Sequence, residues 1–228
     1  MRVLSLFSGI GGLDLAAEWA GMEVVAFCEI EEYPVKVLKR RWPDVPVYND
    51  VRELNRERLE RDGILPIDII TGGFPCQPFS TASRGRRVAN DLSGEFIRII
   101  GEAKPRYIVG ENVGRRIIRD VGKQLRAFGY GTSIHCNRAY DYGADHIRYR
   151  WWAVAYPDDK GKLSGRINAE MAIVPKVQNS IWTAQNMART FRVPDGIPNR
   201  MDRLKALGNA VVPQQAYPIF KAIMEVEE

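Results

Sequence analysis

A cysteine held between two prolines is the residue of this chain best suited to nucleophilic chemistry. Cys76 lies in the segment 72–80, GGFPCQPFS, where Pro75 and Pro78 limit the freedom of the backbone. The thiolate is the reactive form of cysteine, and nearby positive charge lowers the pKa of a thiol. Three arginines follow in the sequence: Arg84, Arg86 and Arg87. The alternative for Cys76 is a buried structural cysteine.

A carboxylate follows the next apolar segment of the chain. Glu111 lies in the segment 110–113, GENV, directly after a strand-like run. A partly buried carboxyl has a raised pKa and can donate a proton to a ring nitrogen. The alternative is a carboxylate at a helix N-terminus, where the helix dipole favours it. Arg148 and Arg150 are expected to lie close to Cys76.

A glycine-rich segment follows the first strand-like run. Residues 7–12, FSGIGG, would allow backbone N–H groups to approach a ligand closely, or would form a tight turn with no ligand. The dinucleotide fingerprint GxGxxG does not fit, because Asp14 stands where its third glycine would be. Glu29 ends the second strand-like run, where an acid can bind ribose hydroxyls or be solvated. Asp50 is expected either to accept a hydrogen bond from the amino group of an adenine or to cap the next helix.

These candidates are positioned by alternating strand-like and helix-like segments. Strands are predicted at 2–7, 23–29, 45–48, 67–71, 106–110, 130–137 and 148–155, and helices at 13–20, 32–42, 52–61, 91–103 and 115–128. Residues 203–226 regain helical character around a break at Gly208 and Asn209. The alternation predicts a Rossmann-like α/β fold, a doubly wound and mostly parallel sheet with helices on both faces. Ligands of such sheets lie beyond the carboxyl ends of the strands, so the three candidate segments should converge there.

Residues 157–200 break this alternation, because they are polar and their apolar residues show no clear period. They are expected to form a small irregular domain or a long loop with a function.

The composition bounds the remaining possibilities. The chain has 228 residues, 45% of them hydrophobic, and a formal net charge of +5, so we expect a folded and mildly basic protein. There is no apolar run long enough to cross a membrane and no signal-peptide pattern at the N-terminus. The three cysteines form no CxxC pair, which disfavours disulfides and a metal site and favours the cytosol. Cys28 and Cys136 lie in apolar runs and are expected to be structural.

Taken in order, these segments resemble the DNA cytosine-5 methyltransferases, which use S-adenosyl-L-methionine. The resemblance covers residues 1–155 and 203–220. The cofactor-binding residues that it implies are Phe7, Ser8, Gly9, Gly11, Gly12, Glu29, Ile30, Asp50, Val51, Pro75, Asn209, Ala210 and Val211. The implied catalytic residues are Cys76, Glu111, Arg148 and Arg150. The implied DNA contacts are Gln77, Ser80, Arg84, Arg86, Arg87 and Arg200.

The resemblance implies covalent catalysis on a cytosine that has left the duplex. The thiolate of Cys76 would add to C6 of the base, after which C5 can accept a methyl group. Glu111 would stabilise or protonate N3, while Arg148 and Arg150 would hold the base and a neighbouring phosphate. Loss of the C5 proton and of Cys76 would release 5-methylcytosine.

The chain departs from the family pattern in two places. His146 stands where the family's Gln-x-Arg-x-Arg pattern begins with glutamine, and only about 57 residues separate Arg150 from Gly208, where the family reads the DNA sequence. We expect a catalytic domain at 1–156, a small target-recognition region at 157–202 and a returning segment at 203–228. A module this short could just supply the roughly 600 Å² that specific DNA binding requires.

Other interpretations stay open at this point. An NAD-type oxidoreductase on the same fold is disfavoured by the missing glycine and by the Pro-Cys-Gln sequence. A methyltransferase-like DNA-binding protein that is inactive, or that needs a partner subunit for recognition, is the second alternative. Double-stranded DNA is the expected partner of a monomer in a prokaryotic or phage-infected cytoplasm, with a restriction endonuclease as a further candidate partner.

Overall fold

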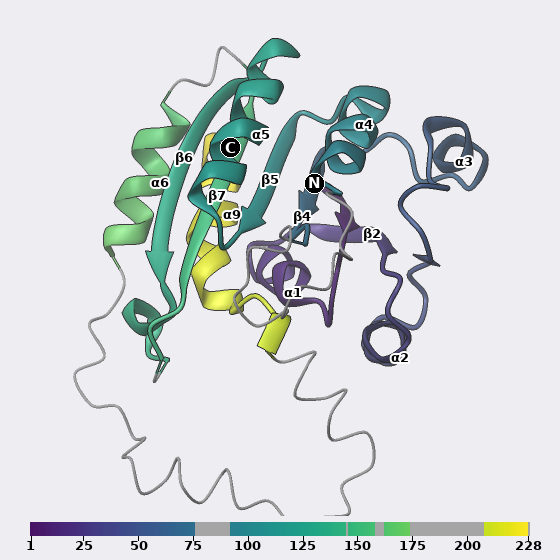
Figure 1. The fold of residues 1–228 in the computed structure, drawn as a ribbon, viewed down its shortest axis with the longest axis horizontal. Helices are drawn as coiled ribbons and strands as arrows, with labels where there is room; N and C mark the ends of the chain where they lie inside the picture. The colour runs from purple at the N-terminus through teal and green to yellow at the C-terminus, as the bar shows by residue number, and fades with distance from the viewer. Residues whose placement is uncertain (76–91, 145, 158–161, 174–207, 228) are drawn as a thin grey trace, which may run out of the picture.

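A seven-stranded sheet with the strand order β3-β2-β1-β4-β5-β7-β6 organises the chain (Figure 1). The computed structural model describes residues 1–75, 92–144, 146–157, 162–173 and 208–227. The strands are β1 Arg2–Leu6, β2 Glu23–Cys28, β3 Val47–Tyr48, β4 Ile69–Gly72, β5 Tyr107–Asn112, β6 Gly131–Arg138 and β7 Tyr149–Tyr156. Among the strands of the described residues, only β7 runs antiparallel to its neighbours, which confirms the predicted doubly wound, mostly parallel α/β fold.

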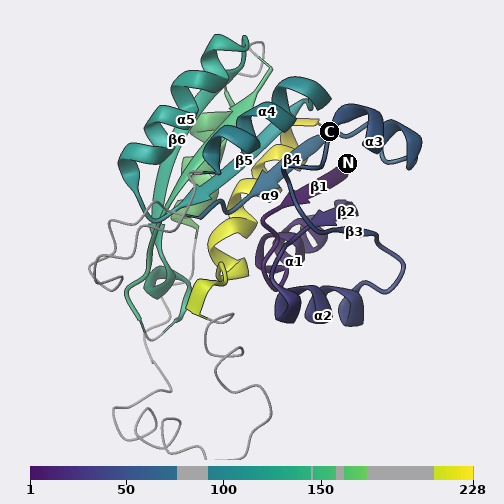
Figure 2. The same ribbon diagram turned by 45° about the vertical axis from the view of Figure 1, so that its right-hand side comes forward.

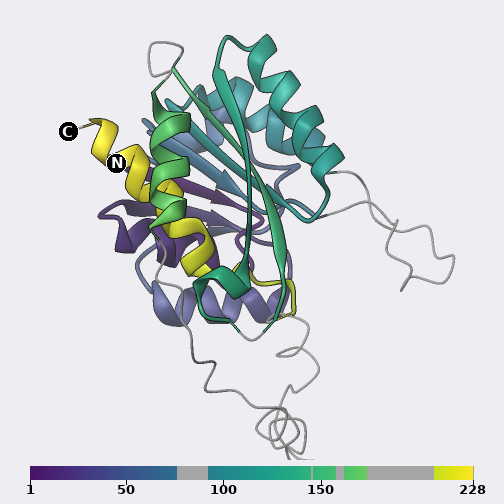
Figure 3. The same cartoon turned by 90° about the vertical axis from the view of Figure 1, so that its left-hand side faces the viewer.

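Helices cover both faces of the sheet, as the alternation predicts. The helices are α1 Gly12–Trp19, α2 Glu32–Arg41, α3 Arg56–Arg61, α4 Ser93–Ala103, α5 Arg115–Ala127, α6 Leu163–Ala172 and α9 Pro213–Glu227, with a 3₁₀ turn at Ala139–Tyr142. Helices α3, α4 and α5 lie on one face of the sheet (Figure 2), where their apolar residues form a core. Those of α1, α2, α6 and α9 form the core on the other, where α6 and α9 lie side by side (Figure 3). Within the described residues, no helix is long and apolar enough to cross a membrane.

The strand register brings distant candidates together. Leu6 of β1 pairs with Gly72 of β4, and Gly72 pairs with Gly110 of β5. The three strands therefore end at nearly the same level. Residues 7–9 and 73–75 consequently leave the sheet beside Glu111 and Asn112, the last two residues of β5, so the three segments converge at one edge as predicted.

The C-terminal helix α9 returns the end of the chain to the glycine-rich turn. A Cβ atom placed on Gly12 would lie 2.3 Å from the carbonyl oxygen of Val211, so only glycine permits this approach. The amide of Gln215 fixes α9 to the sheet, donating to the carbonyl oxygens of Arg148 at 3.1 Å and Asn137 at 3.3 Å. Asn137 in turn donates to the carbonyl oxygen of Gln215 at 2.8 Å.

Two elements differ from the sequence prediction. Helix α3 begins at Arg56 instead of residue 52, because the Asn55 side chain accepts the N–H of Arg58 at 2.8 Å and caps the helix there. Helix α6 lies within a region predicted to lack periodic structure. Its apolar residues Leu163 and Ile167 are fully buried in the sheet core, and a stripe of two residues in so short a helix is too weak to be seen in the sequence.

Candidate active site

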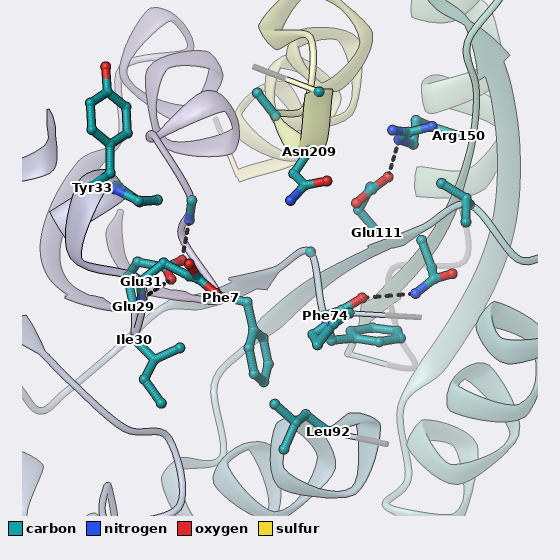
Figure 4. A pocket seen from close by; sticks show the side chains of 18 of the residues that line it. Phe7, Glu29, Ile30, Glu31, Tyr33, Phe74, Leu92, Glu111, Arg150 and Asn209 are labelled. Atoms are coloured by element: carbon teal, nitrogen blue, oxygen red, sulfur yellow. Dashed lines mark hydrogen bonds and ion pairs between the residues drawn. The ribbon is translucent and has the colours of Figure 1, made fainter. Parts of the chain in front are cut away.

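A cavity of about 720 Å³ opens at the carboxyl ends of β1, β2, β4 and β5 (Figure 4). Segments that are far apart in the chain form its wall, namely the turn after β1, the start of α2, the segments after β4 and β5, the start of β7 and the approach to α9. Its lining residues are Phe7, Gly9, Glu29, Ile30, Glu31, Tyr33, Pro34, Gly73, Phe74, Pro75, Leu92, Glu111, Asn112, Val113, Arg148, Arg150, Gly208, Asn209 and Ala210.

Glu29 holds the glycine-rich turn in place. One carboxylate oxygen accepts the N–H of Gly9 at 2.7 Å, and the other accepts the N–H of Glu31 at 2.8 Å. The residue is only 8% exposed, so the interpretation of Glu29 as a solvated strand end does not hold. Phe7 adopts a left-handed backbone with φ of 54°, a strained conformation for an aromatic residue and one often found at ligand sites.

Glu111 is a buried carboxyl paired with a buried guanidinium. Its Oε1 lies 2.5 Å from Nε of Arg150, and both side chains are at most 9% exposed. Burial raises the pKa of Glu111 to about 7, although Arg150 and then Arg148 oppose the rise. The residue is internal to β5 and precedes α5 by several positions, so it is not a helix N-terminal carboxylate.

The contact between Glu111 and Arg150 leaves one oxygen without a hydrogen-bond donor. Oε1 of Glu111 is buried and accepts no hydrogen bond from a described group, although it is in ion-pair contact with Nε of Arg150. Asn209 reaches the same space from the other side of the cavity (Figure 4). An unsatisfied buried carboxyl oxygen is suited to a ligand that brings its own hydrogen-bonding group.

Asn112 connects the segment after β5 with the segment that leads to Cys76. Its Nδ2 donates to the carbonyl oxygen of Phe74 at 2.9 Å, and its Oδ1 accepts the N–H of Gly114 at 2.8 Å. A Cβ atom on Gly73 would lie 3.0 Å from Oε2 of Glu111, so the two segments are in close contact. Pro75, the last described residue before Cys76, lines the cavity.

Arg148 fastens the approach to α9 against β7. Its guanidinium donates to the carbonyl oxygens of Gly208 at 2.7 Å and Ala210 at 2.9 Å. Partial burial lowers the pKa of Arg148 from its usual value, and the like charge of Arg150 adds to this effect.

The structure places some of the predicted cofactor residues away from this cavity. Gly11, Gly12 and Val211 line a second cavity of about 450 Å³ together with His146. The hydroxyl of Ser8 donates to the carbonyl oxygens of Ser5 and Cys28, and Val51 is buried in the core. Asp50 accepts the N–H and the guanidinium of Arg52, which lowers its pKa, and it does not cap α3.

Seven predicted residues lie outside the described part of the chain. They are Cys76, Gln77, Ser80, Arg84, Arg86, Arg87 and Arg200. The other two cysteines are described. Cys28 is buried in β2, and burial raises the pKa of its thiol to about 12. Burial also raises the pKa of the half-buried Cys136.

The sequence did not single out several residues that line the cavity. Tyr33 and Pro34 come shortly after Glu29 at the end of a strand, and this position could have identified them as residues of the site. Leu92 gave no such signal, because it precedes a helix whose placement depends on tertiary packing.

Comparison with known proteins agrees with this geometry. The sequence pattern of the family described as C-5 cytosine-specific DNA methylase matches residues 1–195. The chain belongs to this family. The family assignment confirms the resemblance that the motifs indicate.

Two relatives named as Type II methyltransferases match most of the chain. The Type II methyltransferase M.FnuDI of Fusobacterium nucleatum is 33% identical over 171 residues, which are 70% of this chain and 48% of that protein. The Type II methyltransferase M.NgoPII of Neisseria gonorrhoeae is 30% identical over 235 residues, 96% of this chain and 66% of that protein. The chain thus spans about half to two thirds of the length of these relatives.

Solved structures of methyltransferases share the fold. A putative DNA modification methyltransferase encoded within an E. coli prophage is 32% identical, with a TM-score of 0.59, over 70% of this chain and 47% of that one. The Dnmt2 methyltransferase of S. pombe has a TM-score of 0.63 over 78% of this chain and 56% of that one. At 22% identity, the second likeness concerns the fold alone.

Proposed function

We propose that this protein transfers a methyl group from S-adenosyl-L-methionine to C5 of a flipped-out cytosine in double-stranded DNA. The observation that carries the proposal is the buried pair of Glu111 and Arg150, which lies in the wall of the same cavity as Pro75. Cys76, the nucleophile of the proposed reaction, is the residue that follows Pro75 in the chain.

The cavity fits the proposed cofactor in size and chemistry. Its volume of about 720 Å³ is within the range of small-molecule sites, and Phe7, Ile30 and Leu92 provide an apolar surface for a flat ring. Glu29 provides a carboxylate at the end of β2, where parallel sheets bind ribose hydroxyls. S-adenosyl-L-methionine would supply the methyl group. Asn209 and Ala210 would close the pocket from the α9 side.

Glu111 would act on the pyrimidine ring. A carboxyl whose pKa is about 7 is partly protonated at neutral pH and can donate a proton to N3 of cytosine. The exocyclic amino group of the same base would donate to the carboxyl oxygen that accepts no hydrogen bond from the described residues. Arg150 would keep the carboxyl in place as its charge changes, and Arg148 would orient the start of β7.

Cys76 would form the covalent bond to the base. Its thiolate adds to C6 and the C5–C6 double bond opens, which makes C5 nucleophilic enough to take the methyl group. Removal of the C5 proton then restores the double bond as sulfur leaves with its electron pair. The Cys76 thiolate is thereby regenerated, the C5 proton passes to water, and S-adenosyl-L-homocysteine would be the product left by the methyl donor.

The division of the chain and its DNA contacts are part of the proposal. Residues 1–156 would bind cofactor and carry out the reaction, 157–202 would read the DNA, and 203–228 would complete the cofactor pocket. The buried residues of α6 support a narrower reading segment that begins after Ala172. Gln77, Ser80, Arg84, Arg86, Arg87 and Arg200 would contact the DNA.

A chimera tests this division. We expect replacement of residues 174–202 by the corresponding segment of a relative to change or abolish site preference. Cofactor binding, measured by calorimetry, should be retained. Loss of cofactor binding in the chimera would show that this segment is structural.

The activity itself can be tested directly. The protein is incubated with pooled duplex DNA and methyl-labelled S-adenosyl-L-methionine, and 5-methylcytosine is mapped at base resolution. We expect label at C5 of cytosine within one sequence context. Cofactor and DNA binding without any label would favour the second candidate, a DNA-binding protein that lacks activity or needs a partner subunit.

The relatives also bear on the biological setting. Several are Type II methyltransferases of bacteria, and one is from a virus. We propose a monomer that acts on DNA in a prokaryotic cytoplasm, alone or beside a restriction endonuclease. Gel filtration and sequencing of the neighbouring genes test these two points.

A further inference from the structure

Helix α5 has an outward face that is strongly basic. Its exposed side chains include five basic residues and one acidic residue, Arg115, Arg116, Arg119, Asp120, Lys123 and Arg126. The surplus of four positive charges is most of the chain's formal charge of +5. The sequence pattern of residues 115–128 by itself predicts only a helix.

The arrangement of these charges is unfavourable for the helix itself. Arg115 and Arg116 occupy the first turn, where the helix dipole disfavours cations, and this turn has no acidic residue. Arg119 lies four positions after Arg115 and three after Arg116, spacings at which like charges destabilise a helix. Sequence features that oppose local stability in this way often serve a function.

Arginines on the neighbouring helices do not share this pattern. On α3, Arg56 and Arg58 each contact a carboxylate four residues further along, at 2.7 and 2.6 Å. On α4, Arg98 contacts two carboxylates, both at 2.7 Å. No carboxylate of the described residues forms such a contact with Arg116 or Arg119. Within the described part of the chain, the charge of these two arginines is therefore not neutralised by an ion pair.

The basic face begins at the candidate active site. Helix α5 starts three residues after Asn112, and Val113 lines the cavity. The guanidinium of Arg115 lies 5.0 Å above the ring of Trp151, which pairs with Asn112 across the sheet. This stacking holds Arg115 against β7, beside the strand partner of Asn112 in the cavity wall. At about 1.5 Å per residue, Arg119 is roughly 6 Å further along the helix.

We propose that Arg115, Arg116 and Arg119 bind phosphates of the DNA duplex beside the target base pair. This inference rests on the proposed function, because it takes DNA as the substrate. Guanidinium groups suit phosphate oxygens in charge and in geometry. Phosphate contacts position a duplex without reading its sequence, so this face would fix orientation and leave base recognition to other residues.

The test compares two variants that each lose two positive charges. In R116Q/R119Q the charges are removed from α5. The matched control is R61Q/K104Q, because both control residues are exposed and lie near the amino ends of the strands, opposite to the cavity. Binding is measured on random-sequence duplexes of roughly 40 base pairs over a range of salt concentrations.

We expect R116Q/R119Q to bind DNA more weakly and to lower the slope of log affinity against log salt by about two. The control should keep the wild-type slope. The thermal midpoint of R116Q/R119Q should equal or exceed that of the wild type, because unfavourable charges leave the helix terminus. Cofactor binding should not change.

The outcomes separate this proposal from the proposed function. A wild-type slope for R116Q/R119Q, in a protein that methylates DNA, would overturn the role of α5 alone. The wild type could also bind DNA without methylating it. In that case, a smaller salt dependence of DNA binding in R116Q/R119Q than in the wild type still supports the role of α5. A reduced slope on duplex RNA with no change on DNA would overturn the proposal in favour of a different nucleic acid.

Discussion

The Nε atom of Arg150 lies 2.5 Å from Oε1 of Glu111, and β5 and β7 bury both side chains at the wall of the cavity. Burial alone would make the carboxylate unfavourable, and the guanidinium offsets part of that cost. The balance leaves the pKa of Glu111 at about 7, where a carboxyl can both hold and release a proton.

The first prediction concerns this balance. Replacement of Arg150 by glutamine should raise the pKa of Glu111 further, by about one to three pH units, because its strongest opposing charge is removed. Carbon-13 NMR titration of the glutamate side chains measures the shift directly. R148Q is the control, and its effect should be smaller because Arg148 is the weaker influence. An unchanged titration in R150Q would contradict the assignment.

A second prediction concerns the proton that Glu111 would donate. E111Q keeps the size of the side chain but cannot exchange a proton, so the methylation rate should fall by about 10²–10⁴. In the wild type, kcat/KM should decline as the pH rises through about 7 and Glu111 ionises. That decline should be absent from any residual activity of E111Q. Cofactor binding serves as the control for intact folding.

The nucleophile gives the third prediction. C76S should lose methylation and should no longer form the stable covalent complex with DNA that contains 5-fluorocytosine, because a hydroxyl is a much weaker nucleophile than a thiolate. Denaturing gel electrophoresis detects that complex. C28S is a matched control, since Cys28 is buried in β2 and its raised pKa keeps it protonated. Normal turnover by C76S would exclude the proposed mechanism.

The fourth prediction concerns stability and pH. Asp14 of α1 is fully buried, and burial raises its pKa to about 7, an effect that the nearby Ser5 hydroxyl only partly opposes. Because the folded pKa exceeds the unfolded value of 3.8, the folded protein retains this proton as the pH rises. The associated stability is present below about pH 4 and is lost as the pH approaches about 7.

The variant D14N should remove this contribution to the pH dependence. Its free energy of unfolding should fall less than that of the wild type between about pH 4 and pH 8, by a difference of about 1–4 kcal/mol. Urea denaturation at the two pH values measures it. An identical fall in both proteins would show that Asp14 is not protonated in the folded state.

The fifth prediction concerns the contact between the glycine-rich turn and the approach to α9. In G12A the new methyl group would meet the carbonyl oxygen of Val211, so we expect a loss of about 1–3 kcal/mol of stability and weaker cofactor binding. G94A is the control, because a Cβ atom there meets no other group and alanine favours a helix. Equal stability of the two variants would mean that residues 208–212 move aside without cost.

The fold was predictable from the sequence wherever local patterns decide the structure. Buried parallel strands are short apolar runs, and residues 67–71 and 106–110 could be recognised as such and placed side by side. The start of α3 was missed because several polar residues near position 52 could begin a helix. Only the hydrogen bond from the N–H of Arg58 to the Asn55 side chain shows where the helix starts. Helix α6 was missed because its stability comes from packing against β6 and α9 rather than from its own sequence.

The sequence by itself determined the chemistry of the site, because reactive residue types stand at strand ends whose convergence follows from chain direction. Glu111, Glu29 and Pro75 meet at one cavity for that reason. Only the tertiary structure decided which charges are paired. Arg150 neutralises a buried carboxyl, Arg148 holds two backbone carbonyls, and Arg116 has no described carboxylate partner. Such pairings depend on distances between groups that are remote in the chain, and local sequence patterns contain no information about those distances.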